Sequence, residues 1–160
     1  MSSDSKIVDW PWAEQLAGQW KQQGFSIVFT NGCFDILHIG HVDYLEKARA
    51  LGDKLILGLN SDVSVKNIKG EKRPIVPEYA RARVIASLSF VDMVVIFNED
   101  TPLRLIQAVK PDILVKGDDY TPENIVGADF VINNGGSVKT VPLVKGFSTS
   151  TIIEKIKDLN

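Results

Sequence analysis

The sequence is poor in several residue types, and each shortage excludes a class of protein. Its 160 residues contain a single cysteine, Cys33, which excludes an internal disulfide framework and fits a reducing compartment such as the cytoplasm. No apolar run reaches the length of a membrane span and the N-terminus lacks a signal-peptide pattern, so we expect a cytoplasmic protein with no membrane partner. The formal net charge of −2 provides no basic field, so nucleic acid is not an expected partner.

Two familiar nucleotide-binding motifs are also missing. The sequence has no Walker A motif and no Gly-x-Gly-x-x-Gly, which disfavours a P-loop NTPase or a dinucleotide-dependent dehydrogenase. The length fits one domain with a real core, and 44% apolar and 24% charged residues are ordinary for a globular protein. The chemistry must therefore lie in another motif.

Both histidines of the chain fall in one short segment, residues 30–41. A β-branched run at 26–29 predicts a buried strand before it, and apolar residues at helical spacing follow it. A strand that passes through a polar turn into a helix N-terminus is an anion site. His38 and His41 project from one side of that helix, and Gly40 lets a phosphate approach the backbone. We predict a phosphate site here; the alternative is that both histidines only cap the helix.

Alternating patterns along the chain predict a doubly wound α/β fold. Apolar runs indicate five strands, at 26–29, 54–60, 91–97, 112–115 and 137–144. Helices are expected at 9–23, after 41, at 77–88, from 101, mainly at 123–134 and after 150. This alternation predicts a Rossmann-like, five-stranded, mostly parallel sheet with helices on both faces. Residues 1–24 would form a tail and an amphipathic helix, and 25–160 the main domain.

Helical spacing also predicts which side chains face the core. The expected inward residues are Trp12, Leu16 and Trp20 in the first helix, Ala80, Val84 and Leu88 in the helix at 77–88, and Ile152, Ile153, Ile156 and Leu159 in the last. Thr101 before Pro102, Ser61 before Asp62, and a capping box of Thr151 with Glu154 are expected to start helices. A disordered tail is expected from Met1 to Ser5.

Polar clusters follow the first, fourth and fifth predicted strands, at 31–41, 116–119 and 148–150. Because ligands of such sheets bind beyond the carboxyl ends of the strands, these clusters should converge on one rim. The cation-rich segment 66–74 is either a solvated loop or a mobile basic arm over phosphates, and its place after the second strand favours the arm. Cys33 lies in the phosphate turn, but no further base is near it in sequence, which favours a small residue chosen for fit over a catalytic thiol.

At these residues the chain resembles the cytidylyltransferase-like nucleotidyltransferases, whose mark is a His-x-Gly-His after the first strand. Class I aminoacyl-tRNA synthetases share this signature, but 160 residues leave no room for their larger catalytic domain and their tRNA- and amino-acid-binding parts. From Phe25 onward the chain looks most similar to the adenylyltransferases that make ADP-heptose from heptose 1-phosphate, as separate enzymes or as the C-terminal domain of a bifunctional kinase-transferase. The segments that carry this likeness are 30–38, 60–62, 69–70, 73–74, 99–102 and 111–117.

Two alternatives remain beside that likeness. Glycerol-3-phosphate cytidylyltransferases share the His-x-Gly-His, the Gly-Asp-Asp seen here at 117–119, and a Gly-Ile-Ser-Thr-Thr similar to 146–150. Ser89 and Leu143 stand where that family has arginines, which favours ATP over CTP, whereas ADP-heptose synthases usually show Gly-Gly-Asp at 117–119. A domain that senses a nucleotide without turnover is disfavoured because both motif histidines are present.

The resemblance implies a reaction and a set of residues. A phosphorylated sugar would attack the α-phosphorus of ATP in line, with Mg²⁺ as a cofactor that bridges phosphates, and the enzyme would be a homo-oligomer, a dimer. The implied catalytic residues are His38, His41 and Lys69. The implied acceptor-phosphate residues are Lys72 and Arg73, and Asp35 is a candidate neighbour of the metal. The implied nucleotide-binding residues are Asn31, Gly32, Cys33, Phe34, Gly40, Arg81, Gly117, Asp118, Ser148 and Thr149.

Overall fold

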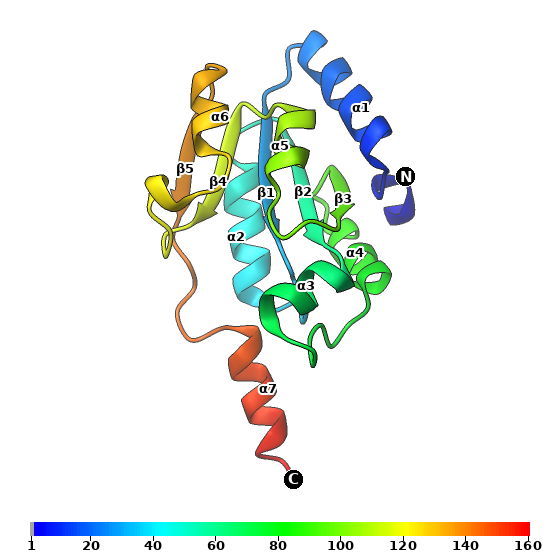
Figure 1. Ribbon diagram of the computed structural model, residues 1–160, viewed down its shortest axis with the longest axis vertical. Coiled ribbons are helices and arrows are strands. Elements are labelled where there is room, and N and C mark those ends of the chain that lie inside the picture. Colours follow the sequence, from blue (N-terminus) through cyan, green and yellow to red (C-terminus); the bar gives the residue numbers. More distant parts are fainter. Residues whose placement is uncertain (1) are drawn as a thin grey trace.

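The five predicted strands form one sheet in the computed structural model, which describes residues 2–160 (Figure 1). They are β1 (Ile27–Gly32), β2 (Lys54–Asn60), β3 (Met93–Phe97), β4 (Ile113–Gly117) and β5 (Ser137–Val141). Their order across the sheet is β3-β2-β1-β4-β5, and every neighbouring pair is parallel. The predicted doubly wound α/β fold is confirmed, and its strand order reverses between β1 and β4.

Helices cover both faces of this sheet (Figure 1). One face packs against α1 (Trp10–Gln22), α5 (Leu103–Val109) and α6 (Ala128–Asn133), and the other against α2 (Ile39–Arg49) and α4 (Glu78–Ala86). The remaining helices are α3 (Asp62–Lys69), α7 (Thr149–Lys157) and the 3-10 helices η1 (Ser3–Lys6) and η2 (Pro122–Asn124). In β1, Ile27 and Phe29 point to the first face and Val28 to the second, as the two-residue period of a strand requires. Within residues 2–160 no helix is both long and apolar enough to cross a membrane.

The buried faces of α1 and α4 match the predicted ones only in part: Leu16, Trp20 and Leu88 pack against the core as predicted, and the other predicted positions do not. In α1, Trp12 is 46% exposed, and the fully buried residues are Ala13 and Ala17. Small side chains let this helix lie close to the sheet, and the bulky indole is left outside. In α4 the buried residues are Arg81, Ala82, Ile85 and Ala86, whereas Ala80 and Val84 of the predicted set are exposed.

The last helix does not pack on the sheet at all. Figure 1 shows α7 (red) projecting from the body of the protein, and none of its residues is buried. Ile156 is 53% exposed and Leu159, just beyond the helix, is 84% exposed. The amphipathic pattern correctly predicted a helix, but the prediction that its apolar face meets the core of this chain was wrong, because residues 142–148 carry α7 beyond the sheet.

Two of the three predicted helix caps were wrong. Ser61 caps α3 as predicted, since its hydroxyl accepts a hydrogen bond from the following turn. At α5, however, Pro102 occupies the N-cap position without a side-chain hydrogen bond, so Thr101 is not the cap. At α7 the cap is Ser148, whose hydroxyl oxygen accepts a hydrogen bond from the backbone N–H of Thr151 at 3.0 Å. The helix therefore begins one turn earlier than a capping box at Thr151 would allow.

Three segments are organised differently from the prediction. Residues 3–6 form η1, and Ile7 pairs with Val94 beside the sheet edge, where a disordered tail was expected; Met1 lies outside the described residues. The cation-rich segment 66–74 begins inside α3, so only its second half is a loop. The helix expected at 123–134 is divided into η2 and α6.

Arg81 is only 1% exposed, which is unusual for a charged side chain. Its guanidinium donates hydrogen bonds to the backbone carbonyls of Cys33 (2.7 Å), Asn60 (2.8 Å) and Val76 (2.8 Å), and to the carboxylate of Asp62 (2.8 Å). Two of these carbonyls lie where β1 and β2 end. Arg81 therefore ties two strand ends to the loop that precedes α4.

Replacing this cation tests that structural role. Arg81→Met removes the donors of three carbonyls and leaves a carboxylate without its partner, so the free energy of unfolding should fall by about 3 kcal/mol or more in urea denaturation. The matched control is Arg104→Met, because Arg104 is exposed and forms only a 3.9 Å ion pair with Glu99. The control should change stability by less than about 0.5 kcal/mol. Full stability of Arg81→Met together with lost nucleotide binding would instead support the role that the resemblance implies.

Candidate active site

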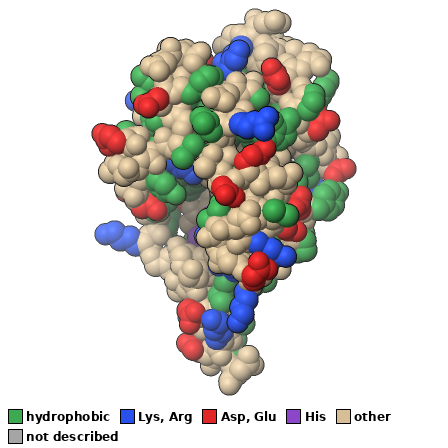
Figure 2. Space-filling view, viewed as in Figure 1, with side chains coloured by type: hydrophobic (Ala, Val, Ile, Leu, Met, Phe, Trp, Pro, Cys, Tyr) green, Lys and Arg blue, Asp and Glu red, His purple; other side chains and the backbone are tan. Residues whose placement is uncertain are grey.

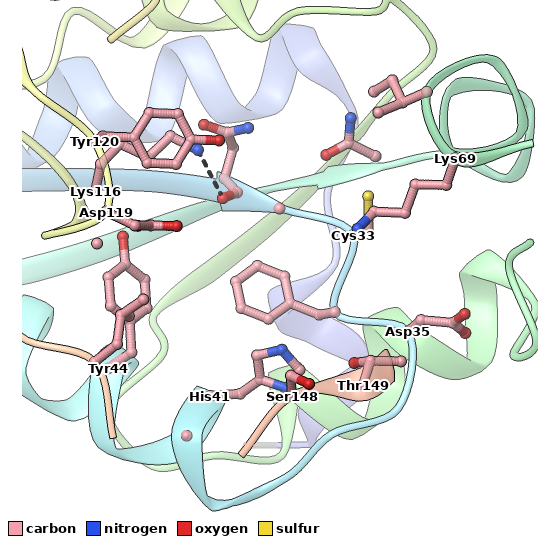
Figure 3. Close-up of a pocket in the computed structure, with 18 of the residues that line it drawn as sticks. Cys33, Asp35, His41, Tyr44, Lys69, Lys116, Asp119, Tyr120, Ser148 and Thr149 are labelled. Atoms are coloured by element: carbon pink, nitrogen blue, oxygen red, sulfur yellow. Dashed lines mark hydrogen bonds between the residues drawn. The ribbon is translucent and has the colours of Figure 1, made fainter. Parts of the chain in front are cut away.

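A cavity of about 670 Å³ opens at the carboxyl ends of the strands, a volume suited to a small-molecule ligand. Residues at the ends of β1, β2 and β4 line it, together with the N-termini of α2 and α7. Figure 2 shows histidine atoms inside a hollow above α7. The three predicted polar clusters meet here, as expected from strand order, with side chains from all three pointing into the cavity (Figure 3).

Most of the predicted site residues line this cavity. They are Asn31, Gly32, Cys33, Phe34, Asp35, His38, Gly40, His41, Lys69, Arg73, Gly117, Ser148 and Thr149. Lys72, Arg81 and Asp118 do not line it. Lys72 and Asp118 are exposed. The guanidinium of Arg81 donates its hydrogen bonds to backbone carbonyls at the ends of β1 and β2. The ligand contacts that the resemblance implies for these three residues therefore stay predictions.

The two histidines form a stacked pair at the start of α2, with ring centroids 3.8 Å apart. His38 is the N-cap, and its Nδ1 accepts a hydrogen bond from the N–H of Gly40 at 3.1 Å. The Nδ1 of His41 accepts one from the N–H of His38 at 3.3 Å. Since Nδ1 is the acceptor in both rings, a neutral ring carries its proton on Nε2. The histidines therefore cap the helix and also retain an N–H donor for a ligand.

Both histidines are uncharged at neutral pH. Burial lowers the pKa of His38, and burial, with His38 and Lys69 nearby, lowers the pKa of His41 to about 4. Two stacked imidazolium rings would also repel each other. Gly40 keeps this stack possible, because a Cβ at that position would lie 2.8 Å from Cε1 of the His38 ring.

The turn before the histidines is strained. Phe34 has φ 45°, a left-handed conformation that is rare for a bulky residue. Its ring is buried and lies edge-on to His41, with 5.1 Å between centroids. A Cβ on Gly32 would come within 2.8 Å of that ring, so the glycine is required by packing. The strain places the phenyl ring where it holds His41 in position.

Asp35 fixes the loop after α3. Its carboxylate accepts hydrogen bonds from Nε of Arg73 and from the backbone N–H groups of Ile75 and Val76, each at 2.8 Å. Burial alone would raise the pKa of Asp35, but the two backbone hydrogen bonds and Arg73 outweigh it and hold the pKa below its usual value. Both carboxylate oxygens are thus engaged, which leaves Asp35 poorly suited to bind a metal.

Cys33 is present as a thiol. Burial raises its pKa above the usual value, although Lys69, Arg81 and Arg73 act in the opposite direction. A thiolate nucleophile needs a lowered pKa, so the structure agrees with the prediction that Cys33 is not a catalytic thiol.

Several cavity residues were not predicted. Lys116 reaches the cavity from the end of β4, and Asp119 and Tyr120 line it where Asp118 was expected. The hydroxyl of Tyr44 lies 2.6 Å from that of Thr30 and donates a hydrogen bond to a β4 carbonyl. Lys116 could have been found, because it ends a strand inside a predicted polar cluster. Tyr44 has no such signal, since in sequence it is one aromatic residue of an amphipathic helix.

Comparisons with known proteins agree with this geometry. The chain matches the cytidylyltransferase-like family over residues 29–155. It is 56% identical over 154 residues to the bifunctional protein HldE of Geobacter metallireducens, and 59% identical over 145 residues to the protein of the same name in Campylobacter jejuni. These matches cover 96% and 91% of this chain but 31% of each relative, so the chain spans about a third of their length.

Solved structures show the same fold. The lipopolysaccharide core biosynthesis protein from Thermoplasma volcanium is 32% identical, with a TM-score of 0.62 over 78% of this chain and 100% of that chain. Pantoate-beta-alanine ligase from Francisella tularensis has a TM-score of 0.59 over 94% of this chain and 76% of its own, but at 14% identity it shows the fold alone. The family match includes both stacked histidines and the cluster at the start of α7, and the chain belongs to the cytidylyltransferase-like family.

Proposed function

We propose that this chain is an adenylyltransferase that transfers AMP from ATP to D-glycero-beta-D-manno-heptose 1-phosphate, giving ADP-heptose and pyrophosphate. The observation that carries the proposal is the high identity to HldE proteins across a segment whose motif histidines both line the cavity. The cavity is also large enough for a nucleotide next to a sugar phosphate.

The proposed chemistry needs no general base, because a phosphate oxygen of the acceptor is already anionic at neutral pH. That oxygen attacks the α-phosphorus, a new P–O bond forms, and the bond to the pyrophosphate leaving group breaks. Catalysis is then the positioning of phosphates and the stabilisation of their charge. The Nε2–H groups of His38 and His41 donate to phosphate oxygens, Lys69 approaches from the end of α3, and Ser148 and Thr149 bind the β- and γ-phosphates.

Mg²⁺ is part of this proposal as a partner of the nucleotide. Among residues 2–160 no group of three or more His, Cys, Asp or Glu side chains could hold a metal ion, and Asp35 is occupied by its own hydrogen bonds. We therefore propose that Mg²⁺ enters bound to the phosphates of ATP, where it neutralises their charge.

One observation bears on the alternative of CTP and glycerol 3-phosphate. Leu143 stands where the glycerol-3-phosphate cytidylyltransferases have an arginine. It lines the cavity and offers no hydrogen-bond donor to a pyrimidine or a phosphate. Ser89 is exposed and does not line the cavity, so it contributes nothing to base selection. The preference for ATP thus depends on Leu143 rather than on both positions.

We further propose that the protein acts in the cytoplasm as a homodimer. The proposed use of ATP and the single, free cysteine Cys33 support the location. The apolar side of α7, made of Ile152, Ile153 and Ile156 and continued by Leu159, has no fully buried residue within residues 2–160 and supports self-association.

Substrate preference is tested by pyrophosphate release from each nucleotide with each acceptor. ATP with heptose 1-phosphate should exceed CTP with glycerol 3-phosphate in kcat/KM by about tenfold or more, because each unmade hydrogen bond costs ~1–3 kcal/mol. The reverse order would make the protein a cytidylyltransferase. Nucleotide binding without pyrophosphate release from any pair would favour a sensor domain.

Dimerisation is tested by size-exclusion chromatography with light scattering. Ile156→Glu places a charge on the apolar side of α7 and should convert a dimer into a monomer. The control is Lys155→Ala, which changes an exposed cation of the same helix and should leave the mass unchanged. A wild-type mass of one chain at micromolar concentration would refute the dimer.

The histidine role predicts proton uptake when ATP binds. His41 is neutral in the free protein at pH ~5.5, and nearby phosphates raise its pKa, so the complex takes up protons there and none near pH ~8. The uptake is measured by calorimetry in buffers that differ in ionisation enthalpy. His41→Gln should take up fewer protons, while the ionisation of ATP itself is the same for both proteins. Equal uptake by both would mean that no phosphate lies near His41.

A further inference from the structure

Lys116 is a partly buried cation that forms no ion pair within residues 2–160. It stands at the carboxyl end of β4, and its Nζ donates one hydrogen bond, to the backbone carbonyl of Asn31 at 3.3 Å. Its Nζ also lies 5.2 Å from the centroid of the Tyr120 ring. Within residues 2–160 no carboxylate forms an ion pair with it. An ammonium has three N–H donors, so two are left for a ligand.

One buried polar atom near Lys116 has no hydrogen-bond partner within residues 2–160. The side-chain oxygen of Asn31, next to it, is buried and has no hydrogen-bond partner. Burial lowers the pKa of Lys116 to about 8, while Cys33 and Asp119 raise it slightly, so the side chain is still mainly charged at neutral pH. Buried charges in proteins are normally paired, whereas within residues 2–160 this partly buried ammonium has only the hydrogen bond to Asn31 and the contact with the Tyr120 ring.

The other cations of the cavity do not occupy the same place. Arg73 is bound to Asp35, and Lys69 and Lys116 lie on opposite sides of the cavity (Figure 3). The stacked histidines are neutral donors and add no positive charge. Lys116 is therefore the cation at the point where the strand order reverses between β1 and β4, and ligands of doubly wound sheets bind at such points.

We propose that Lys116 is a further catalytic residue, whose ammonium binds a phosphate oxygen at the reacting centre. This inference rests on the proposed adenylyl transfer. The phosphate belongs either to the α-position of the nucleotide or to the acceptor, and in both cases the cation offsets the repulsion between two anionic groups that must approach each other. No proton is transferred, since the ammonium acts only as a donor and a charge.

Stability separates this role from a structural one. An unpaired buried ammonium opposes folding, so Lys116→Met, which keeps the length of the side chain, should melt at the same temperature as the wild type or higher. A structural role for the cation predicts a lower melting temperature. The matched control is Lys139→Met on the neighbouring strand β5, where the lysine is exposed and outside the cavity.

Kinetics provide the second readout. Lys116→Met should lower kcat/KM by about 100-fold, the scale for losing one charged donor in a transition state, and Lys116→Arg should recover part of it. Lys139→Met should retain wild-type kinetics. A Lys116→Met enzyme with unchanged kinetics would overturn the proposal.

Binding assays identify the phosphate and do not require turnover. In one arm a non-hydrolysable ATP analogue is compared with adenosine, and in the other heptose 1-phosphate is compared with free heptose. Lys116→Met should weaken binding of the phosphorylated member of one pair by about tenfold and leave the unphosphorylated member unchanged. Loss in the first arm assigns Lys116 to the nucleotide, and loss in the second assigns it to the acceptor. No selective loss in either arm overturns the proposal.

A pH profile adds a check on charge. Wild-type kcat/KM should fall above pH about 8 as Lys116 loses its proton, and Lys116→Arg should hold its activity there. The other titratable groups that face Lys116 are Asp119, Tyr120, Cys33 and Tyr44, and burial raises the pKa of both Cys33 and Tyr44. If the wild type binds the nucleotide analogue but never releases pyrophosphate, the proposed function is rejected. The comparison of the ATP analogue with adenosine would still show whether Lys116 binds a phosphate.

Discussion

Two buried charges hold the turn after β1, and the rest of the site depends on them. Arg81 binds the carbonyls of Cys33 and Asn60, where β1 and β2 end, and Asp35 binds Arg73 and the backbone of the following loop. Each charge is satisfied by several hydrogen bonds, which is the condition under which a buried ion is tolerated. Arg81 and Asp35 fix the turn from both sides, so the strained Phe34 and the histidines that follow it are held in a single conformation. An enzyme that works by positioning phosphates needs such a rigid frame.

The charge distribution of the cavity follows from the same frame. The capping hydrogen bonds that hold His38 and His41 also fix their tautomer, and burial keeps both rings neutral, so in the proposed role they would orient phosphates without attracting them strongly from a distance. Because Arg73 forms an ion pair with Asp35, Lys69 and Lys116 provide most of the attraction of the cavity for anions. A partly buried cation that forms no ion pair within residues 2–160 is best explained by the anionic ligand that we propose it binds.

The strands, the histidine cluster and the meeting of three polar clusters could be predicted from the sequence, because strand period and the rule for carboxyl ends depend on local patterns. The buried faces of the helices could be predicted only in part. Trp12 is more apolar than Ala13, yet the alanine packs on the sheet because a close approach of backbone to backbone favours a small residue. The resemblance implied a nucleotide contact for Arg81, and its backbone acceptors in three separate segments, two of them distant in sequence, follow no local pattern.

The same limit explains α7, whose pattern correctly predicted a helix but not that its apolar side would stay outside the core. Ser148 and Thr149, at its N-terminus, line the cavity, while its apolar side faces away from the core of the chain. The hydroxyl of Thr149 donates to the carbonyl of Ile36 at 3.4 Å, a weak bond with which to orient a whole helix. A second copy packed on α7, as proposed above, would restrict the helix and with it the two hydroxyl groups that we propose bind the phosphates. Self-association and phosphate binding would then be coupled through one short helix, and a substitution at Ile156 would alter the position of the Ser148 hydroxyl.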